Sequence, residues 1–256
     1  MNKITKYGMA VNADGSMMAV SYTYPLHQVH VFRLTPLEQV RMIGREGAGP
    51  AEFGSPRRLC FTDKDNILVC DFNNNRVQQL TYAGEYLSSF SVQGPFSIAA
   101  HSDMVAVGCY DGPIEIHSLA TGEMFHRFGL CGDGTGQIHT FATGIRFTPD
   151  GACLLVAECS NHWLSMFTVD GVFMKRIGVG VLDDGFNDVS YGAGGEIIVA
   201  DFGNHRVCVL SPNSDTLIKT WGSEGTVAGQ FRFPTSLAVS GSYLYVMDGS
   251  HVQVFE

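Results

Sequence analysis

The sequence is poor in charge and lacks features that define several classes of protein. Charged residues make up 16% of its 256 residues, and 16 Lys and Arg stand against 25 Asp and Glu, which gives a net charge of −9. This balance argues against nucleic acid as the main ligand, because a phosphate backbone needs clustered basic side chains. No apolar run approaches the roughly 18 residues of a membrane-spanning helix. The first 15 residues also hold no hydrophobic stretch of signal-peptide length. We therefore expect a cytoplasmic protein without membrane contact.

The cysteines also argue against export. They are odd in number, no C-x-x-C pair occurs, and several stand inside apolar segments. This pattern favours buried thiols in a reducing compartment over a disulfide framework. The seven are Cys60, Cys70, Cys109, Cys131, Cys153, Cys159 and Cys208.

Motifs that indicate catalysis are missing as well. The sequence has no G-x-S-x-G, no H-E-x-x-H and no G-x-x-x-x-G-K-[ST] segment. The glycine-rich GREGAG at 44–49 leads into PAEF and favours a turn over a phosphate site. DDGFND at 183–188 lacks EF-hand spacing and favours a solvated acidic turn. We expect no catalytic residue, no bound metal and no cofactor.

What the sequence does contain is a repeat. VCDFNNNRVQQL (69–80) and VADFGNHRVCVL (199–210) share an apolar run, an Asp, a short linker, an Arg and a second apolar run. VAECSNHWLSMF (156–167) and VMDGSHVQVF (246–255) are further copies, and 19–32 and 106–119 are weaker ones. Successive copies lie 50, 38, 49, 43 and 47 residues apart when the equivalent positions are taken as Ser21, Asp71, Cys109, Glu158, Asp201 and Asp248. A period near 45 residues is that of a four-stranded propeller blade.

Each unit divides into four short segments, and the second is continuously apolar, as in ILVC and IIVA. A strand that is apolar on both faces must be covered on both faces, which stacked blades provide. We therefore expect an all-β, six-bladed β-propeller in a single domain, with blades at about 1–44, 45–94, 95–130, 131–178, 179–222 and 223–256. The sixth unit ends after its third segment, so the last blade lacks an outer strand. Either residues 1–4 form a stub of that strand or the chain is cut from a longer protein, and we favour the second.

The repeat resembles the NHL-repeat family of propellers. GSEGTVAGQFRFPTSLAV (222–239) and GREGAGPAEFGSPRRL (44–59) match the leading half of that repeat, and VADFGNHRVCVL matches the trailing half, with Asn204, His205 and Arg206 in place. Asn161 and His162 also match, whereas Trp163 replaces the Arg. The resemblance implies a propeller, most often six-bladed, and predicts fold far better than activity.

The repeated Asp and Arg are expected to be structural. Asp71 ends one strand and Arg76 begins its antiparallel partner, and Asp201 and Arg206 repeat the arrangement. Each pair is expected to clamp its loop, with the intervening Asn suited to left-handed or capping geometry. A partly exposed ion pair of this kind contributes only about 0–1 kcal/mol. Glu158 stands opposite Trp163, so the fourth blade is expected to lack the clamp.

Candidate binding residues gather in the loops at one end of the ring. Loops between second and third strands and loops between blades share that end, and loops on a rigid scaffold commonly carry recognition. Trp163 is the least expected residue there, and two interpretations stay open: packing on a neighbouring blade, or an exposed aromatic that binds protein. The candidates are Arg57, Arg58, Asn74, Arg76, His162, Trp163, His205, Arg206, Arg232 and His251.

Three functional classes stay open. A non-catalytic protein-interaction module, either on its own or as the recognition part of a larger protein, is favoured because fold signals are strong and catalytic ones are missing. A metal-dependent six-bladed lyase or hydrolase would need His or carboxylates near the axis; His162, His205 and His251 lie on one end, but the first strands offer few ligands. RNA binding would use the arginines of the loop end, although the net charge of −9 argues against a broad positive field.

Overall fold

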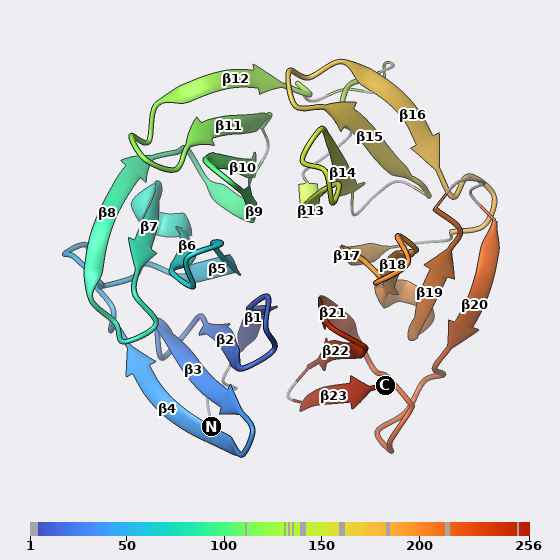
Figure 1. Ribbon diagram of the computed structural model, residues 1–256, viewed down its shortest axis with the longest axis horizontal. Coiled ribbons are helices and arrows are strands. Elements are labelled where there is room, and N and C mark those ends of the chain that lie inside the picture. The colour runs from blue at the N-terminus through green and yellow to red at the C-terminus, as the bar shows by residue number, and fades with distance from the viewer. Residues whose placement is uncertain are drawn as a thin grey trace.

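In the computed structural model, six β-sheets are arranged as a ring around a central axis (Figure 1). The structure describes all residues except 1–4, 111, 131, 133, 135, 139–141, 159–161, 183–184, 213–215 and 250. Five sheets have four antiparallel strands, and the sixth, β21-β22-β23, has three. The predicted six-bladed propeller with an incomplete last blade is therefore confirmed. Cys131, Cys159, Asn161, the first two residues of DDGFND and the predicted stub at 1–4 lie outside the described residues.

Strand order runs outward from the axis in every blade. The innermost strands are β1 (Lys6–Val11), β5 (Pro56–Phe61), β9 (Pro95–His101), β13 (Ala142–Phe147), β17 (Phe186–Tyr191) and β21 (Pro234–Ser240). The second strands are β2 (Met17–Tyr22), β6 (Ile67–Asp71), β10 (Met104–Cys109), β14 (Cys153–Glu158), β18 (Ile197–Asp201) and β22 (Tyr243–Asp248). The third strands are β3 (Gln28–Leu34), β7 (Arg76–Leu80), β11 (Ile114–Ser118), β15 (Leu164–Thr168), β19 (Arg206–Leu210) and β23 (His251–Phe255). The outer strands are β4 (Leu37–Ile43), β8 (Tyr86–Ser91), β12 (Met124–Phe128), β16 (Phe173–Ile177) and β20 (Leu217–Trp221).

The continuously apolar segments are the second strands, as the repeat predicts. Every residue of β6 and β18 is buried. Six clusters of buried apolar side chains lie between neighbouring blades, one at each interface around the ring. Removing one large aliphatic side chain from such a cluster costs about 2–5 kcal/mol. The fold is therefore held together mainly by blade-on-blade packing.

Side-by-side packing of the first and last blades closes the ring. Met9 and Met18 of the first blade share a buried cluster with Tyr245 and Met247 of the last. The Met9 amide also donates to Ser236 Oγ at 3.3 Å, which joins β1 to β21 directly. Within the described residues, β23 pairs with β22 on one side and with no fourth strand on the other. β23 is therefore the outermost strand of the last sheet among the residues that the structure describes.

Strand register aligns the innermost strands of all six blades. Met9, Leu59, Ile98, Ile145, Val189 and Leu237 each pair with a valine of the second strand in their own blade. The residues immediately before these six form what we call the polar ring: Gly8, Arg58, Ser97, Gly144, Asp188 and Ser236. The same register corrects the alignment of the first repeat. Tyr22, not Ser21, stands two residues after the valine, where Asp71 stands in the second blade.

Within the described part of the chain, no helix has the length and apolar character needed to cross a membrane. Five of the seven cysteines are described and all five are free thiols. Burial raises the pKa of Cys109 and Cys208 to about 12, so these thiols stay protonated at neutral pH.

Candidate functional site

The repeated Asp and Arg form the expected ion pair, and the pair fastens a second loop as well. Arg76 Nε lies 2.8 Å from Asp71 Oδ2, and Asn74 Nδ2 donates to the same oxygen at 2.9 Å. The amide of Gly54, in the loop that enters the blade, donates to Asp71 Oδ1 at 2.6 Å. Arg76 also donates to the carbonyls of Gly49 and Glu52, at 2.8 and 3.0 Å. One carboxylate therefore anchors both loops at this end of the blade.

The ion pair of Asp71 and Arg76 is expected to contribute more to stability than the sequence indicated, because it is buried. The Asp71 side chain has no exposed surface and Arg76 is 17% exposed, so the pair belongs to the interior and not to the surface. Breaking a buried pair leaves an uncompensated charge and costs several kcal/mol, well above the 0–1 kcal/mol of an exposed pair. Asp201 and Arg206 repeat the geometry at 2.6 Å, with Asp201 fully buried. Asn74, Arg76 and Arg206 therefore direct donors into their own blades.

The fourth and sixth blades use the same position differently. Ser165 Oγ donates to the buried Glu158 at 2.8 Å. Trp163, which replaces the clamp Arg, packs against Arg176 of its own blade. The guanidinium carbon of Arg176 lies 4.2 Å from the centroid of the Trp163 ring. In the last blade, Asp248 accepts the Arg232 amide at 3.0 Å. The carboxylates at this position in the second, fifth and sixth blades thus accept hydrogen bonds from loop residues, whereas Glu158 accepts one from strand β15.

We call the end of the ring that carries the loops between second and third strands the loop face. Arg57 lies in an aromatic cluster at this end. Its guanidinium carbon is 4.3 Å from the centroid of Tyr7, 4.7 Å from Phe72 and 5.4 Å from Phe96. Tyr110 extends the cluster, with its ring centroid 5.7 Å from Phe72 and 5.8 Å from Phe96. The rings come from three neighbouring blades, and Tyr110 is 45% exposed. We call these five side chains the Arg57 cluster.

A second aromatic group lies on the loop face at the fifth and sixth blades. Phe202 and Phe233 stack with centroids 5.0 Å apart, and His205 lies 5.7 Å from Phe233. Phe233 is 47% exposed and Arg232 is exposed beside it. His205 Nδ1 contacts the Arg232 carbonyl oxygen. Phe72 and Phe202 occupy the same place, since each opens a 3-10 turn directly after the clamp Asp: η1 (Phe72–Asn74) and η2 (Phe202–Asn204).

The histidines of the loop face do not form a metal centre in the described part of the chain. No three His, Cys, Asp or Glu side chains among the described residues come together in an arrangement that would hold an ion. His162 and His251 are exposed, whereas His205 is half-buried against Phe233.

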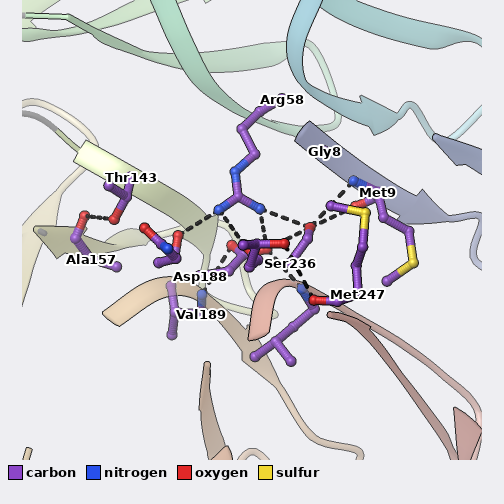
Figure 2. A network of polar contacts seen from close by, with 12 residues as sticks. Gly8, Met9, Arg58, Thr143, Ala157, Asp188, Val189, Ser236 and Met247 are labelled. Atoms are coloured by element: carbon purple, nitrogen blue, oxygen red, sulfur yellow. Dashed lines mark hydrogen bonds and ion pairs between the residues drawn. The ribbon is translucent and has the colours of Figure 1, made fainter. Parts of the chain in front are cut away.

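Arg58 is not on the loop face, contrary to the sequence expectation. It belongs to the polar ring, is 7% exposed and points across the axis (Figure 2). Arg58 Nη1 donates to Asp188 Oδ2 and to Ser236 Oγ, both at 2.7 Å. Nη2 donates to the carbonyls of Asn187 at 2.5 Å and Thr235 at 2.7 Å. Arg58 thus joins the second blade to the fifth and sixth, whereas Arg57 lies among aromatic rings of the first three blades.

Comparison with known proteins agrees with this architecture. The family model of the NHL repeat matches residues 53–80 and 187–210, in the second and fifth blades. No curated protein matches the chain. Among solved structures, hydrazine synthase of Kuenenia stuttgartiensis is similar with a TM-score of 0.72 and 12% identity, over 100% of this chain and 96% of that one. This likeness shows the shared propeller fold alone, and the expected resemblance to NHL-repeat propellers is confirmed.

Proposed function

We propose that this NHL-repeat β-propeller is a non-catalytic protein-interaction module that recognises a protein partner through its loop face. The observation that carries the proposal is the Arg57 cluster. It places one arginine and four aromatic rings from three blades within contact distance of one another. Arg and Tyr are enriched among residues that dominate binding energy at protein interfaces.

The arrangement of the cluster suits a protein surface better than single-stranded RNA. Bases bind by stacking on open aromatic faces, but the Arg57 guanidinium already lies over Tyr7, Phe72 and Phe96. What the cluster offers to a partner is the exposed part of Tyr110 and the partly exposed rings of Tyr7 and Phe72, since Phe96 is buried. The net charge of −9 also works against a nucleic-acid backbone.

Exposed apolar side chains elsewhere are arranged differently. Those of the outer strands, such as Leu37 (72% exposed) and Met174 (51% exposed), are spread over the circumference of the ring. Scattered apolar residues are ordinary on protein surfaces, whereas a contiguous group marks an interaction site. The outer strands therefore supply suitable control positions.

Affinity capture from the native cytosol, with variants of this chain as bait, tests the proposal. Tyr110→Ser and Trp163→Ala alter the loop face, and Leu37→Ser removes a more exposed apolar side chain from an outer strand. We expect the proteins retained by the wild type to be retained by Leu37→Ser and to be lost or reduced about tenfold with Tyr110→Ser. Equal retention by all loop-face variants, or equal loss with Leu37→Ser, would contradict the proposal.

A second assay separates protein from RNA as the partner. Labelled single-stranded RNA is titrated against the wild type and against an Arg57→Glu/Arg232→Glu variant. We expect that the wild-type protein shows no salt-dependent binding of the RNA. Salt-dependent binding that the double substitution abolishes would replace the proposed partner class. The free thiols of the described cysteines fit our further proposal that the protein works in the reducing cytoplasm.

A further inference from the structure

A blind cavity opens on the axis at the end of the ring opposite the loop face. Its volume is about 250 Å³, and all six innermost strands contribute to its wall. The residues that follow the six aligned positions of the innermost strands all line it. We call this set the cavity ring: Ala10, Cys60, Ala99, Arg146, Ser190 and Ala238.

The cavity exists because the cavity ring consists almost entirely of small side chains. Five of its six members are Ala, Ser or Cys, and the sixth is Arg146. Leu59, Phe61 and Phe147 at neighbouring positions add apolar groups to the wall, and His101 and Thr148 add polar ones. The space bounded by polar-ring residues Arg58, Ser97 and Asp188 has no room for a water molecule. The inner end of the cavity is therefore closed.

Arg146 is the one member of the cavity ring with a permanent charge, and much of its hydrogen-bonding capacity is unused. Its Nη1 donates to the Ile145 carbonyl at 2.9 Å and its Nη2 to the Leu237 carbonyl at 3.1 Å. A guanidinium has five N–H groups, so these two bonds leave about three for a ligand. The side chain is 24% exposed, consistent with a group that faces the cavity mouth.

Among the residues that the structure describes, the carboxylate nearest to Arg146 is shared with another arginine. Asp188 Oδ2 lies 3.7 Å from Arg146 Nη2 but only 2.7 Å from Arg58 Nη1. The same oxygen also accepts Ser236 Oγ at 3.0 Å and the Leu237 amide at 2.9 Å. Because Arg58 already balances its charge, the polar and cavity rings together carry one excess positive charge. The cavity thus combines a lining in which most residues are apolar, with His101, Thr148 and Ser190 as polar members, and the excess charge of Arg146 inside an acidic protein.

We propose that this cavity binds a small organic monocarboxylate, with the carboxylate on Arg146 and a short apolar chain against the alanine walls. Arg pairs with carboxylates through parallel N–H donors, which favours this anion over a spherical one. The volume limits ligand size: at about 30 Å³ for each water-sized group, 250 Å³ accommodates about eight non-hydrogen atoms. An aliphatic acid of four to six carbons fits this description.

Calorimetric titration with four probes tests the charge and the apolar chain separately. The probes are pentanoate, pentanamide, pentylammonium and inorganic phosphate. We expect pentanoate to bind once per chain, and each of the other three to bind at least about tenfold more weakly, which corresponds to 1.4 kcal/mol. Binding of pentanamide as tight as that of pentanoate would refute the role of charge. Binding of phosphate as tight as that of pentanoate would refute the role of the apolar walls.

Variants tie the site to Arg146. We expect Arg146→Met to raise the Kd of pentanoate at least about tenfold, while Arg33→Met, an exposed arginine of β3, leaves it unchanged. Circular dichroism and thermal unfolding show whether Arg146→Met is folded. If this variant is unfolded, the titration of the wild type with the four probes tests the proposal. Ala238→Leu, which fills the cavity and keeps the charge, is expected to abolish binding of pentanoate. Pentanoate binding that survives both changes, or no binding to the wild type, would overturn the proposal.

Discussion

Removing Asp188 is expected to be one of the most damaging single changes in this propeller. Its carboxylate, 1% exposed, is the anion beside Arg58 and Arg146 and accepts hydrogen bonds from Ser236 Oγ and from the amides of Leu237 and Val189. Asp188→Ala would leave the buried Arg58 guanidinium uncompensated and the amides of Leu237 and Val189 without this acceptor, while Ser236 Oγ could still donate to the Met9 carbonyl. The first effect alone costs about 3–5 kcal/mol, and each unsatisfied buried donor adds about 1 kcal/mol or more. We expect a loss of at least about 5 kcal/mol.

Arg58→Met should cost less than Asp188→Ala. Asp188 would keep three hydrogen-bond donors, and Arg146, at 3.7 Å, would take over part of the compensation of charge. We expect about 3 kcal/mol, the lower end for a broken buried pair. The double variant Arg58→Met/Asp188→Ala should lose less than the sum of the two single losses, because the two side chains interact directly.

Urea unfolding followed by circular dichroism measures these differences in the free energy of unfolding. They appear as shifts of the urea midpoint when the dependence of the free energy on urea concentration is unchanged. Arg33→Met is the matched control, because its ion pair with Glu38 is 50% and 58% exposed and should contribute less than about 1 kcal/mol. A loss below about 1 kcal/mol for Asp188→Ala would refute the reasoning. So would a larger loss for Arg58→Met, or strictly additive losses in the double variant.

Three further predictions use other features of the chain. Gly44→Ala should cost about 3 kcal/mol in urea unfolding, because φ is +90° and the new Cβ would lie 2.5 Å from the buried Phe53 ring, whereas Gly180→Ala, at φ +75° in open space, should cost about 1 kcal/mol. Burial raises the pKa of Cys208, which has no exposed surface, to about 12. Iodoacetamide should therefore leave Cys208 unmodified at neutral pH in the native state and alkylate it in urea, as peptide mass spectrometry would show; rapid native labelling would contradict this. Burial lowers the pKa of His30, so the unfolded chain takes up its proton first and stability should fall as pH drops below about 6.5. Urea midpoints of the wild type and His30→Gln would show a weaker acid dependence in the variant if this is correct, and the same dependence if it is not.

The architecture was predictable because it rests on local patterns that recur in the chain. Continuous apolar segments such as ILVC and IIVA predicted the second strands, and both are fully buried. The Asp71–Arg76 and Asp201–Arg206 pairs were predictable for the same reason, since two antiparallel strands joined by a short turn bring their ends together. The burial of these carboxylates was not predicted, because it depends on the loop that enters the blade and covers them.

The axial chemistry was not predictable in the same way. Arg58, Arg146 and Asp188 were visible in the sequence, but they belong to three different blades and meet only when the ring is closed. Their positions relative to the axis also depend on irregularities in the pairing of innermost and second strands, as between Pro56 and Leu59. An irregularity of the same kind in β1 accompanies the one-residue error in the first repeat. One aromatic partner of Arg57 did leave a signal in the sequence: Phe72 follows the repeat Asp, as Phe202 does in the other strong copy.

The polar ring has a consequence for the order in which the chain folds. Arg58 and Asp188 are 130 residues apart, and their contact requires several intervening blades to be in place. Such a contact is expected to form after the rate-limiting barrier, since closing so long a segment early is entropically unfavourable. Loss of the contact should then accelerate unfolding and leave the rate of refolding nearly unchanged. The contacts of Arg58 would thus slow the unfolding of the assembled propeller and have little influence on the rate at which it folds.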